Sequence, residues 1–143
     1  MSDPARILTM ECLALHADLS LRDFCGKFQA ALHLPDFRFD YENETEWALT
    51  EINNIEYNVS RPYEAATLTE WDNTVPEECN FGITLCLLSG HASPNHEWAF
   101  ENLVVPVARV VANEFAAGVY YHRSWIGPGQ NIPRSILYQP NEA

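Results

Sequence analysis

Basic residues are scarce in this sequence. Eight Lys and Arg residues stand against twenty Asp and Glu residues in a chain of 143, which gives a formal net charge of −12. A field of that sign repels phosphate backbones and attracts basic surfaces, so we expect a basic protein as partner and no nucleic acid. High net charge also keeps a protein in solution, and solubility alone is the simpler explanation of the same composition.

Long apolar runs and paired cysteines are also missing. No run comes close to the roughly 20 apolar residues that a membrane-spanning helix needs, and the first six residues lack the basic start of a signal peptide. We therefore expect a cytoplasmic protein that forms one domain over residues 1–143, a length that needs neither a disulfide nor a metal for stability. Its thiols are expected to be free, because no CxxC pair occurs among Cys12, Cys25, Cys79 and Cys86.

Recognised catalytic and ligand-binding motifs are absent as well. The sequence has no GxSxG motif, and the glycine-rich segment 127–129 is followed by neither a helix nor a lysine, as a phosphate-binding loop requires. His91 and His96, with Glu97, come nearest to metal-ligand spacing, but zinc needs three or four converging ligands. We therefore expect no catalytic residue, no cofactor and no metal site, and a protein that is not an enzyme.

The start of the chain has the pattern of a strand followed by a helix. Residues 6–15 alternate between an apolar face and a face that carries Thr9 and Glu11, which predicts a strand. Ser20 suits the N-cap of a helix. Apolar residues then recur at helical spacing up to Pro35, which disfavours helix in the residue before it.

The clearest local signal is a hairpin. Residues 47–52 and 55–60 read as two strands joined by Asn53-Asn54, a pair that tolerates the positive φ angles of a type I′ turn. This turn aligns apolar residues on one side and sets Glu51 opposite Glu56 on the side away from the core. Like charges that face each other across strands are destabilising. Either the pair is kept for a basic partner, or the segment 61–79 covers it.

The remaining segments complete a β-α-β-β-β-α-β order. Residues 61–79 read as a long excursion and 81–88 as a central strand buried on both faces. A second helix starts near 93–95, kinks or restarts at Pro106 and ends at Gly118; a strand over 119–125 and an irregular tail over 126–143 follow. This order predicts an α+β two-layer sandwich, a variant of the ferredoxin-like arrangement, with a mostly antiparallel sheet of about five strands and two helices on one face.

The negative charge is concentrated in residues 36–78. That stretch holds twelve acidic residues against Arg38 and Arg61, so it carries −10 of the total of −12. Acidic surfaces speed the encounter with basic proteins. We predict that a basic partner binds here, through Glu42, Glu44, Glu46, Trp47, Glu51, Glu56, Asp72, Glu77 and Glu78.

An aromatic strand near the end of the chain suggests an alternative site. Aromatic residues with arginine are typical of binding hot spots, and simple alternation puts Tyr121, Arg123 and Trp125 on one face and His122 on the other. The alternative function is a small-ligand-binding domain or an enzyme, in which Arg61 or Arg123 binds an anion and His122 acts as general base. A subunit that homodimerises through an exposed sheet edge is a third possibility.

Three segments have the look of a family signature: residues 58–63 (NVSRPY), 79–83 (CNFGI) and 121–127 (YHRSWIG). Together with the small size, the acidic charge and the lack of catalytic motifs, they make the chain similar in overall character to the immunity proteins of bacterial polymorphic toxins, of the contact-dependent inhibition and type VI effector kinds. The resemblance implies an inhibitor that covers the active or substrate-binding surface of a basic toxin, for example a nuclease.

Overall fold

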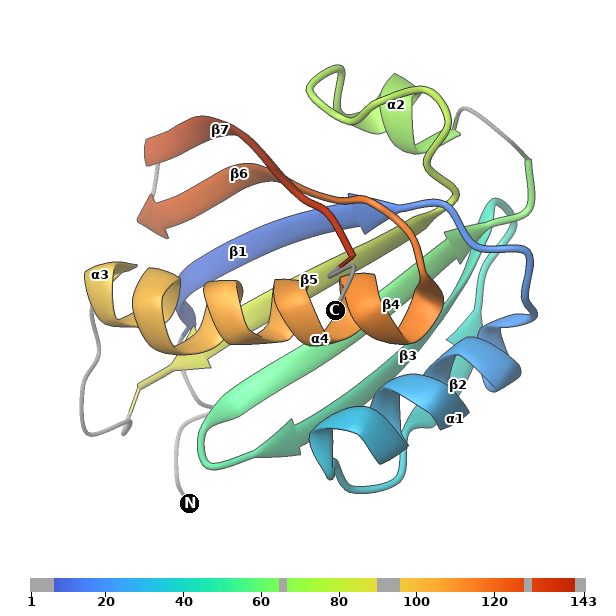
Figure 1. Ribbon diagram of the computed structural model, residues 1–143, viewed down its shortest axis with the longest axis horizontal. Helices are drawn as coiled ribbons and strands as arrows, with labels where there is room; N and C mark the ends of the chain where they lie inside the picture. The colour runs from blue at the N-terminus through green and yellow to red at the C-terminus, as the bar shows by residue number, and fades with distance from the viewer. Residues whose placement is uncertain (1–6, 65–66, 90–95, 128–129, 141–143) are drawn as a thin grey trace.

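A seven-stranded antiparallel sheet organises the molecule. The structure is a computed structural model that describes residues 7–64, 67–89, 96–127 and 130–140. The strand order is β2-β3-β4-β5-β1-β6-β7 (Figure 1). Helices α1 (Leu21–Leu32) and α4 (Val105–Phe115) cover one face, which we call the helix face, and the other is the open face. The predicted α+β fold with an antiparallel sheet is confirmed.

Five strands lie where the sequence predicts them: β1 (Ile7–Leu15), β3 (Thr45–Ile52), β4 (Ile55–Pro62), β5 (Phe81–Leu88) and β6 (Val119–Gly127). β5 is the central strand, as expected. The predicted type I′ hairpin is also confirmed, because Asn53 and Asn54 have φ angles of 54° and 61° and Glu51 pairs with Glu56.

The sheet differs from the predicted one of about five strands by one further strand at each edge. β2 (Arg38–Tyr41) pairs only with β3, and β7 (Gln130–Tyr138) pairs only with β6. The supposedly irregular tail is therefore largely strand. Its alternation is weak because an edge strand is half exposed, and Pro133 is tolerated there because an edge strand leaves one side of its backbone unpaired.

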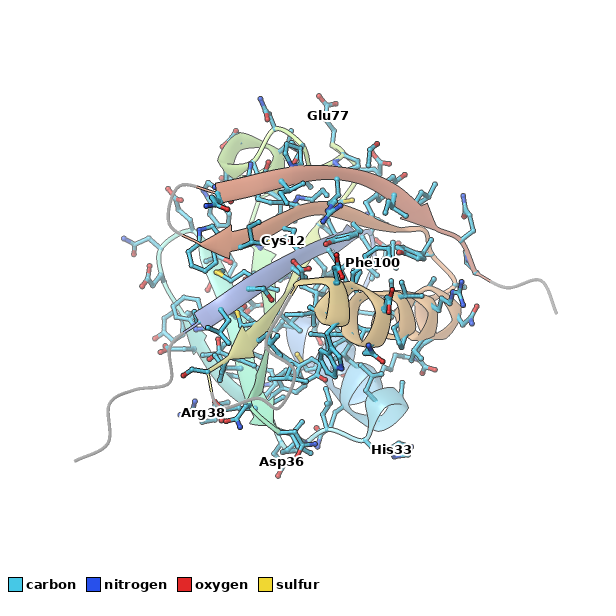
Figure 2. The ribbon with its side chains drawn as sticks, turned by 90° about the vertical axis from the view of Figure 1, so that its left-hand side faces the viewer. Cys12, His33, Asp36, Arg38, Glu77 and Phe100 are labelled. Carbon is cyan, nitrogen blue, oxygen red and sulfur yellow. The ribbon has the colours of Figure 1, made fainter. Side chains whose placement is uncertain are left out.

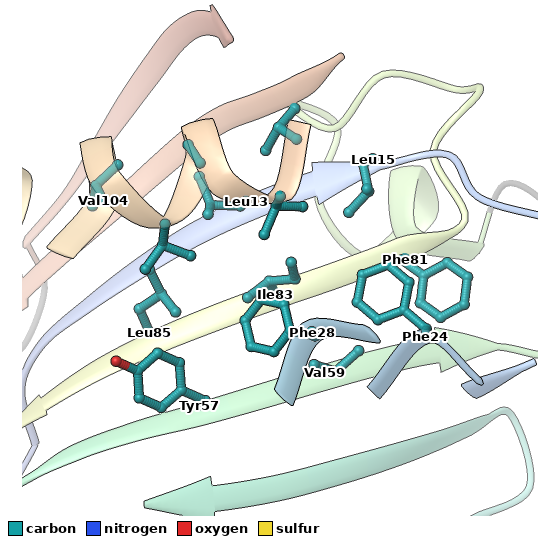
Figure 3. Close-up of a cluster of buried hydrophobic side chains, with 14 of the residues drawn as sticks. Leu13, Leu15, Phe24, Phe28, Tyr57, Val59, Phe81, Ile83, Leu85 and Val104 are labelled. Carbon is teal, nitrogen blue, oxygen red and sulfur yellow. The ribbon is translucent and has the colours of Figure 1, made fainter. Parts of the chain in front are cut away.

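Aromatic packing holds the helices to the helix face. Phe24 of α1 stacks on Phe81 of β5 (Figure 3), with ring centroids 4.3 Å apart. On Phe115 of α4 it stacks with ring centroids 4.2 Å apart. Leu13 and Leu15 of β1 complete this region of the core. Full burial of one such phenylalanine contributes on the order of 2–3 kcal/mol, so this cluster fixes how both helices sit on the sheet.

The helix ends follow local rules, with one correction. Ser20 caps α1 by accepting a hydrogen bond from the Asp23 backbone. The second helix runs without a break through α3 (His96–Ala99), a π-helical turn η1 (Phe100–Val104) and α4. Pro106 lies in the first turn of α4, so the helix widens before the proline and does not restart there. A proline ring clashes with the carbonyl four residues earlier, which accounts for the wider turn before it. The helix ends at Ala116, which has a φ of 49°, and not at Gly118 as predicted. The predicted start at 93–95 lies outside the described residues.

The excursion after β4 packs on the open face. It contains α2 (Thr67–Trp71), and Leu68, Val75 and Cys79 form a small second core with Ala14 of β1. The excursion covers the end of the sheet near Gly82 and Ser60. Glu56 lies four residues before Ser60 in β4, towards the hairpin turn and away from this cover. In the described part of the chain, no helix is both long enough and apolar enough to cross a membrane.

Candidate functional site

A hollow of about 490 Å³ lies between the start of α1 and the edge strand β2. Tyr41 and Tyr63 line it with 74% and 49% of their surface exposed, and Arg22, Phe39 and Glu46 form its walls. Large aromatic side chains are costly to expose to water, and two of them at one hollow make it a candidate interaction surface.

A second hollow, of about 250 Å³, adjoins the first. Tyr63 lines both hollows, and the second is otherwise polar and acidic. Five acidic residues and one basic residue, Arg22, line the two hollows together. We call this region the tyrosine–acid surface and define it by Tyr41, Tyr63, Asp40, Glu44, Glu46, Glu64 and Glu70.

Backbone hydrogen bonds at the turn between β2 and β3 position this surface. The Tyr63 N–H donates to the Glu44 carbonyl over 3.1 Å, which holds the residue after β4 against the turn. Within the sheet, Arg61 Nη1 lies 3.4 Å from Glu46 Oε1, and this half-buried ion pair orients the carboxylate. The result is a surface built from three neighbouring strands and the segment that follows them.

The structure separates the nine residues predicted to bind a partner into three places. Glu44 and Glu46 line the tyrosine–acid surface, and Glu42 lies in the adjoining turn. The second group, Trp47, Glu51 and Glu56, lies on the open face of the sheet itself. The third group, Asp72, Glu77 and Glu78, lies in the excursion that packs on that face near Ser60 and Gly82. Glu77 projects from the opposite side of the molecule to Asp36 and Arg38 (Figure 2), so the acidic stretch wraps around the fold.

Sequence reasoning missed the tyrosines of this surface. Tyr41 ends an edge strand that the pattern did not reveal, and Tyr63 follows a proline in a segment without periodicity. The available signal was the pair of large aromatic residues inside an acidic stretch. Their exposure depends on where β2 and β4 end, which the sequence pattern does not show.

A β-bulge in β6 rearranges the alternative site. Cys12 of β1 pairs with Arg123 and the next residue, Leu13, pairs with Tyr121, so His122 and Arg123 together face one residue of β1. A bulge of this kind adds one residue and reverses the alternation beyond it. Simple alternation was therefore wrong here: Tyr121 lies on the helix face, and His122 and Arg123 both lie on the open face.

The two bulge residues bind the loop that follows α2. Arg123 Nη2 donates to Asp72 Oδ1 over 3.1 Å, and Thr74 Oγ1 donates to the same oxygen over 2.6 Å. His122 Nδ1 lies 3.2 Å from Thr74 Oγ1 and 3.4 Å from Asp72 Oδ2. We call these four residues the Asp72 cluster.

Opposite effects set the charges of the Asp72 cluster. Burial acts to raise the pKa of Asp72, but the hydrogen bonds from Thr74 and the nearby His122 and Arg123 outweigh it, and the pKa is lowered. Burial lowers the pKa of His122 more than the Asp72 carboxylate raises it. The loop is thus held by an ionised carboxylate and a neutral imidazole at neutral pH.

On the helix face, the same bulge brings together the two hydroxyl groups that hydrogen-bond a buried glutamate, Glu11. Glu11 is 0% exposed, and it accepts hydrogen bonds from Tyr121 Oη over 3.0 Å and from Ser124 Oγ over 2.5 Å. In a regular strand, residues 121 and 124 point to opposite faces, and the extra residue brings them to one. The Tyr121 ring also stacks on Phe100 of η1.

The remaining predicted residues are dispersed. Arg61 forms an ion pair with Glu46 on the helix face. Trp125 lies opposite Met10 of β1, on the open face, so neither residue joins Tyr121. All four cysteines are free, as expected. Burial, reinforced by Glu11, raises the pKa of Cys12 to about 12, which keeps this thiol protonated. In the described residues, no three His, Cys, Asp or Glu side chains gather as metal ligands.

In comparisons with known proteins, the chain matches no family model, no curated protein and no solved structure.

Proposed function

We propose that this protein binds a basic partner protein through the tyrosine–acid surface. The observation that supports the proposal is the exposure of Tyr41 and Tyr63 on adjoining hollows lined by five acidic residues and one arginine. Exposed tyrosines supply contact area at a small entropic cost and are enriched among binding hot spots.

The chemistry of the surface suits arginine and lysine side chains. A guanidinium or ammonium group that enters the larger hollow meets two tyrosine ring faces and the Glu46 carboxylate. The surrounding carboxylates attract such a partner over a distance and speed the encounter. Affinity then depends mainly on the tyrosines, because exposed ion pairs contribute little.

The biological form that we propose is an immunity-type inhibitor in the cytoplasm. Its steric mechanism is to cover the basic active or substrate-binding surface of a toxin. This form rests on the resemblance in size, charge and motif content described above, and the acidic surface supports it because a toxin that acts on nucleic acid presents cationic groups to its substrate.

The binding experiment uses the purified product of the gene next to the one that encodes this chain. Surface plasmon resonance at several salt concentrations gives association and dissociation rates. The Tyr41→Ala/Tyr63→Ala variant should dissociate at least about tenfold faster than the wild type. The Glu44→Gln/Glu70→Gln variant should associate several-fold more slowly at low salt, and the difference should shrink as salt screens the charges.

The matched control is Glu51→Gln/Glu56→Gln, which removes the same charge from the open face. We expect its association to lie within about twofold of the wild type. A loss of association in this control with normal behaviour of the tyrosine variant would place the partner on the open face. Failure of the wild type to bind, and to rescue growth of cells that express the neighbouring gene, would reject the immunity form.

A further inference from the structure

A cavity of about 170 Å³ lies between α2 and the open face, away from the tyrosine–acid surface. Leu68, Val75 and Ala14 give it apolar walls, and Ser60, Thr84 and His122 supply polar groups. Gly82 lies at its floor, and a Cβ added there would be in ordinary van der Waals contact with Leu68 Cδ2, 3.5 Å away. The cavity therefore has a mostly apolar lining with a few polar points.

The hydrogen bonds of the Asp72 cluster fix the tautomer of His122. The Thr74 hydroxyl proton is directed at Asp72 Oδ1, 2.6 Å away, so Thr74 Oγ1 can only accept from His122 Nδ1. Asp72 is also an acceptor on the Nδ1 side. In the neutral ring, Nδ1 therefore carries the proton and Nε2 is a hydrogen-bond acceptor.

The Nε2 acceptor is left without a protein partner. His122 is 7% exposed, and no residue in the described part of the chain hydrogen-bonds its Nε2. Nε2 is not one of the fully buried side-chain atoms that lack a partner, so solvent reaches it. A ligand group that replaces water at this acceptor has to be a donor, that is, an O–H or N–H.

The charges beside the cavity and its volume restrict the chemical class of the ligand further. An anion would lie beside the Asp72 carboxylate, and Arg123 is already paired with that carboxylate. A cation would find the same oxygens occupied by Thr74 and Arg123. An apolar cavity of ~150 Å³ in another protein holds benzene, so this one has room for a single ring and not for a metabolite of ordinary size.

We propose that the cavity beneath α2 binds a small neutral aromatic molecule with one O–H or N–H donor, and that this donor bonds to His122 Nε2. Apolar walls take the ring, and the acceptor orients the ligand. The site is independent of the tyrosine–acid surface, so partner binding and ligand binding are tested separately.

Phenol is the probe, and benzene is the comparison without a donor. Titration followed by nitrogen-15 NMR of the imidazole should move the His122 Nε2 resonance, and phenol should raise the melting temperature in a saturable way. Benzene should bind about tenfold more weakly, because it cannot form the hydrogen bond. The affinity for phenol should lie in the millimolar range that a ligand of so few atoms allows.

Two leucine variants locate the site. Ser60→Leu fills the cavity beneath α2 and should abolish the effects of phenol, while its melting temperature without ligand reports that the fold is intact. Ser135→Leu fills a neighbouring hollow that His122 also lines, and it should bind phenol normally. The proposal is overturned if phenol does not bind, if it binds no better than benzene, if Nε2 does not respond, or if only Ser135→Leu blocks binding.

Discussion

Glu11 shows how much one buried polar side chain depends on its neighbours. Its carboxylate, Tyr121 and Ser124 are all 0% exposed, and both hydroxyls donate to it. Replacing Glu11 with alanine leaves two buried donors without this acceptor, so we expect a loss of about 2–4 kcal/mol in the free energy of unfolding, measured with urea.

The hydroxyl partners test the origin of that loss. Tyr121→Phe and Ser124→Ala remove the donors one at a time, and each should cost less than Glu11→Ala. In combination with Glu11→Ala they should cost little more, because the shared interaction is already gone. Additive losses would show that the hydrogen bonds do not account for the effect.

His122 gives stability a defined dependence on pH. Its pKa is lowered below the unfolded value of about 6.5, chiefly by burial, so the unfolded chain takes up the proton first as pH falls. The contribution is fully present above that value and is lost between it and the folded pKa. The free energy of unfolding of the wild type should therefore fall as the pH decreases below about 6.5.

The variant that isolates this effect is His122→Asn, which keeps an N–H donor near Asp72 and does not titrate. Urea unfolding at several pH values should give it a shallower slope than the wild type over this range. The other histidines are common to both proteins, so the difference in slope reports His122. Equal slopes would contradict the assignment of this pH dependence to His122.

Asp72 affects stability at lower pH. Its pKa is also lowered, so its contribution to the free energy of unfolding is present above the unfolded value near 4 and is lost below it.

At the scale of elements, helix α4 ends in an unfavourable residue. Ala116 adopts a left-handed conformation with a φ of 49°, which glycine occupies at far lower cost. Ala116→Gly should therefore raise the free energy of unfolding by about 0.5–1 kcal/mol. The control is Ala117→Gly, one residue later and without a positive φ, which should lower it by a similar or smaller amount. Equal effects of the two changes would exclude the conformational explanation.

Elements with local signals were predictable, and those defined by their neighbours were not. Asn53-Asn54 and Ser20 act within a few residues, and the structure has the turn and the cap where the pattern placed them. β7 becomes a strand because β6 offers it a partner. The bulge at His122 and Arg123 is stabilised by Asp72 and Thr74, through hydrogen bonds that join residues 51 and 48 positions apart in the chain.

At the scale of the whole molecule, the charge of −12 opposes folding through self-repulsion. The most local case is Glu51 opposite Glu56 on the open face. The Glu51→Gln/Glu56→Gln variant should be more stable than the wild type by about 0.5–1 kcal/mol at low salt. Urea unfolding in rising sodium chloride should narrow that gap, because salt screens exposed charges. A gap that does not change with salt would mean that repulsion is not its cause.

The sequence by itself determined the fold class, the hairpin register and the strongly acidic character, because alternation, turn chemistry and composition act within short stretches of chain. Contacts between distant segments decided which acids lie together, that Tyr41 and Tyr63 are exposed beside them, and that His122 and Arg123 share the open face. Those features depend on where strands end and on one inserted residue in a strand. A single-residue shift reverses every side chain beyond it, and contacts across the sheet, not local preference, determine where it occurs.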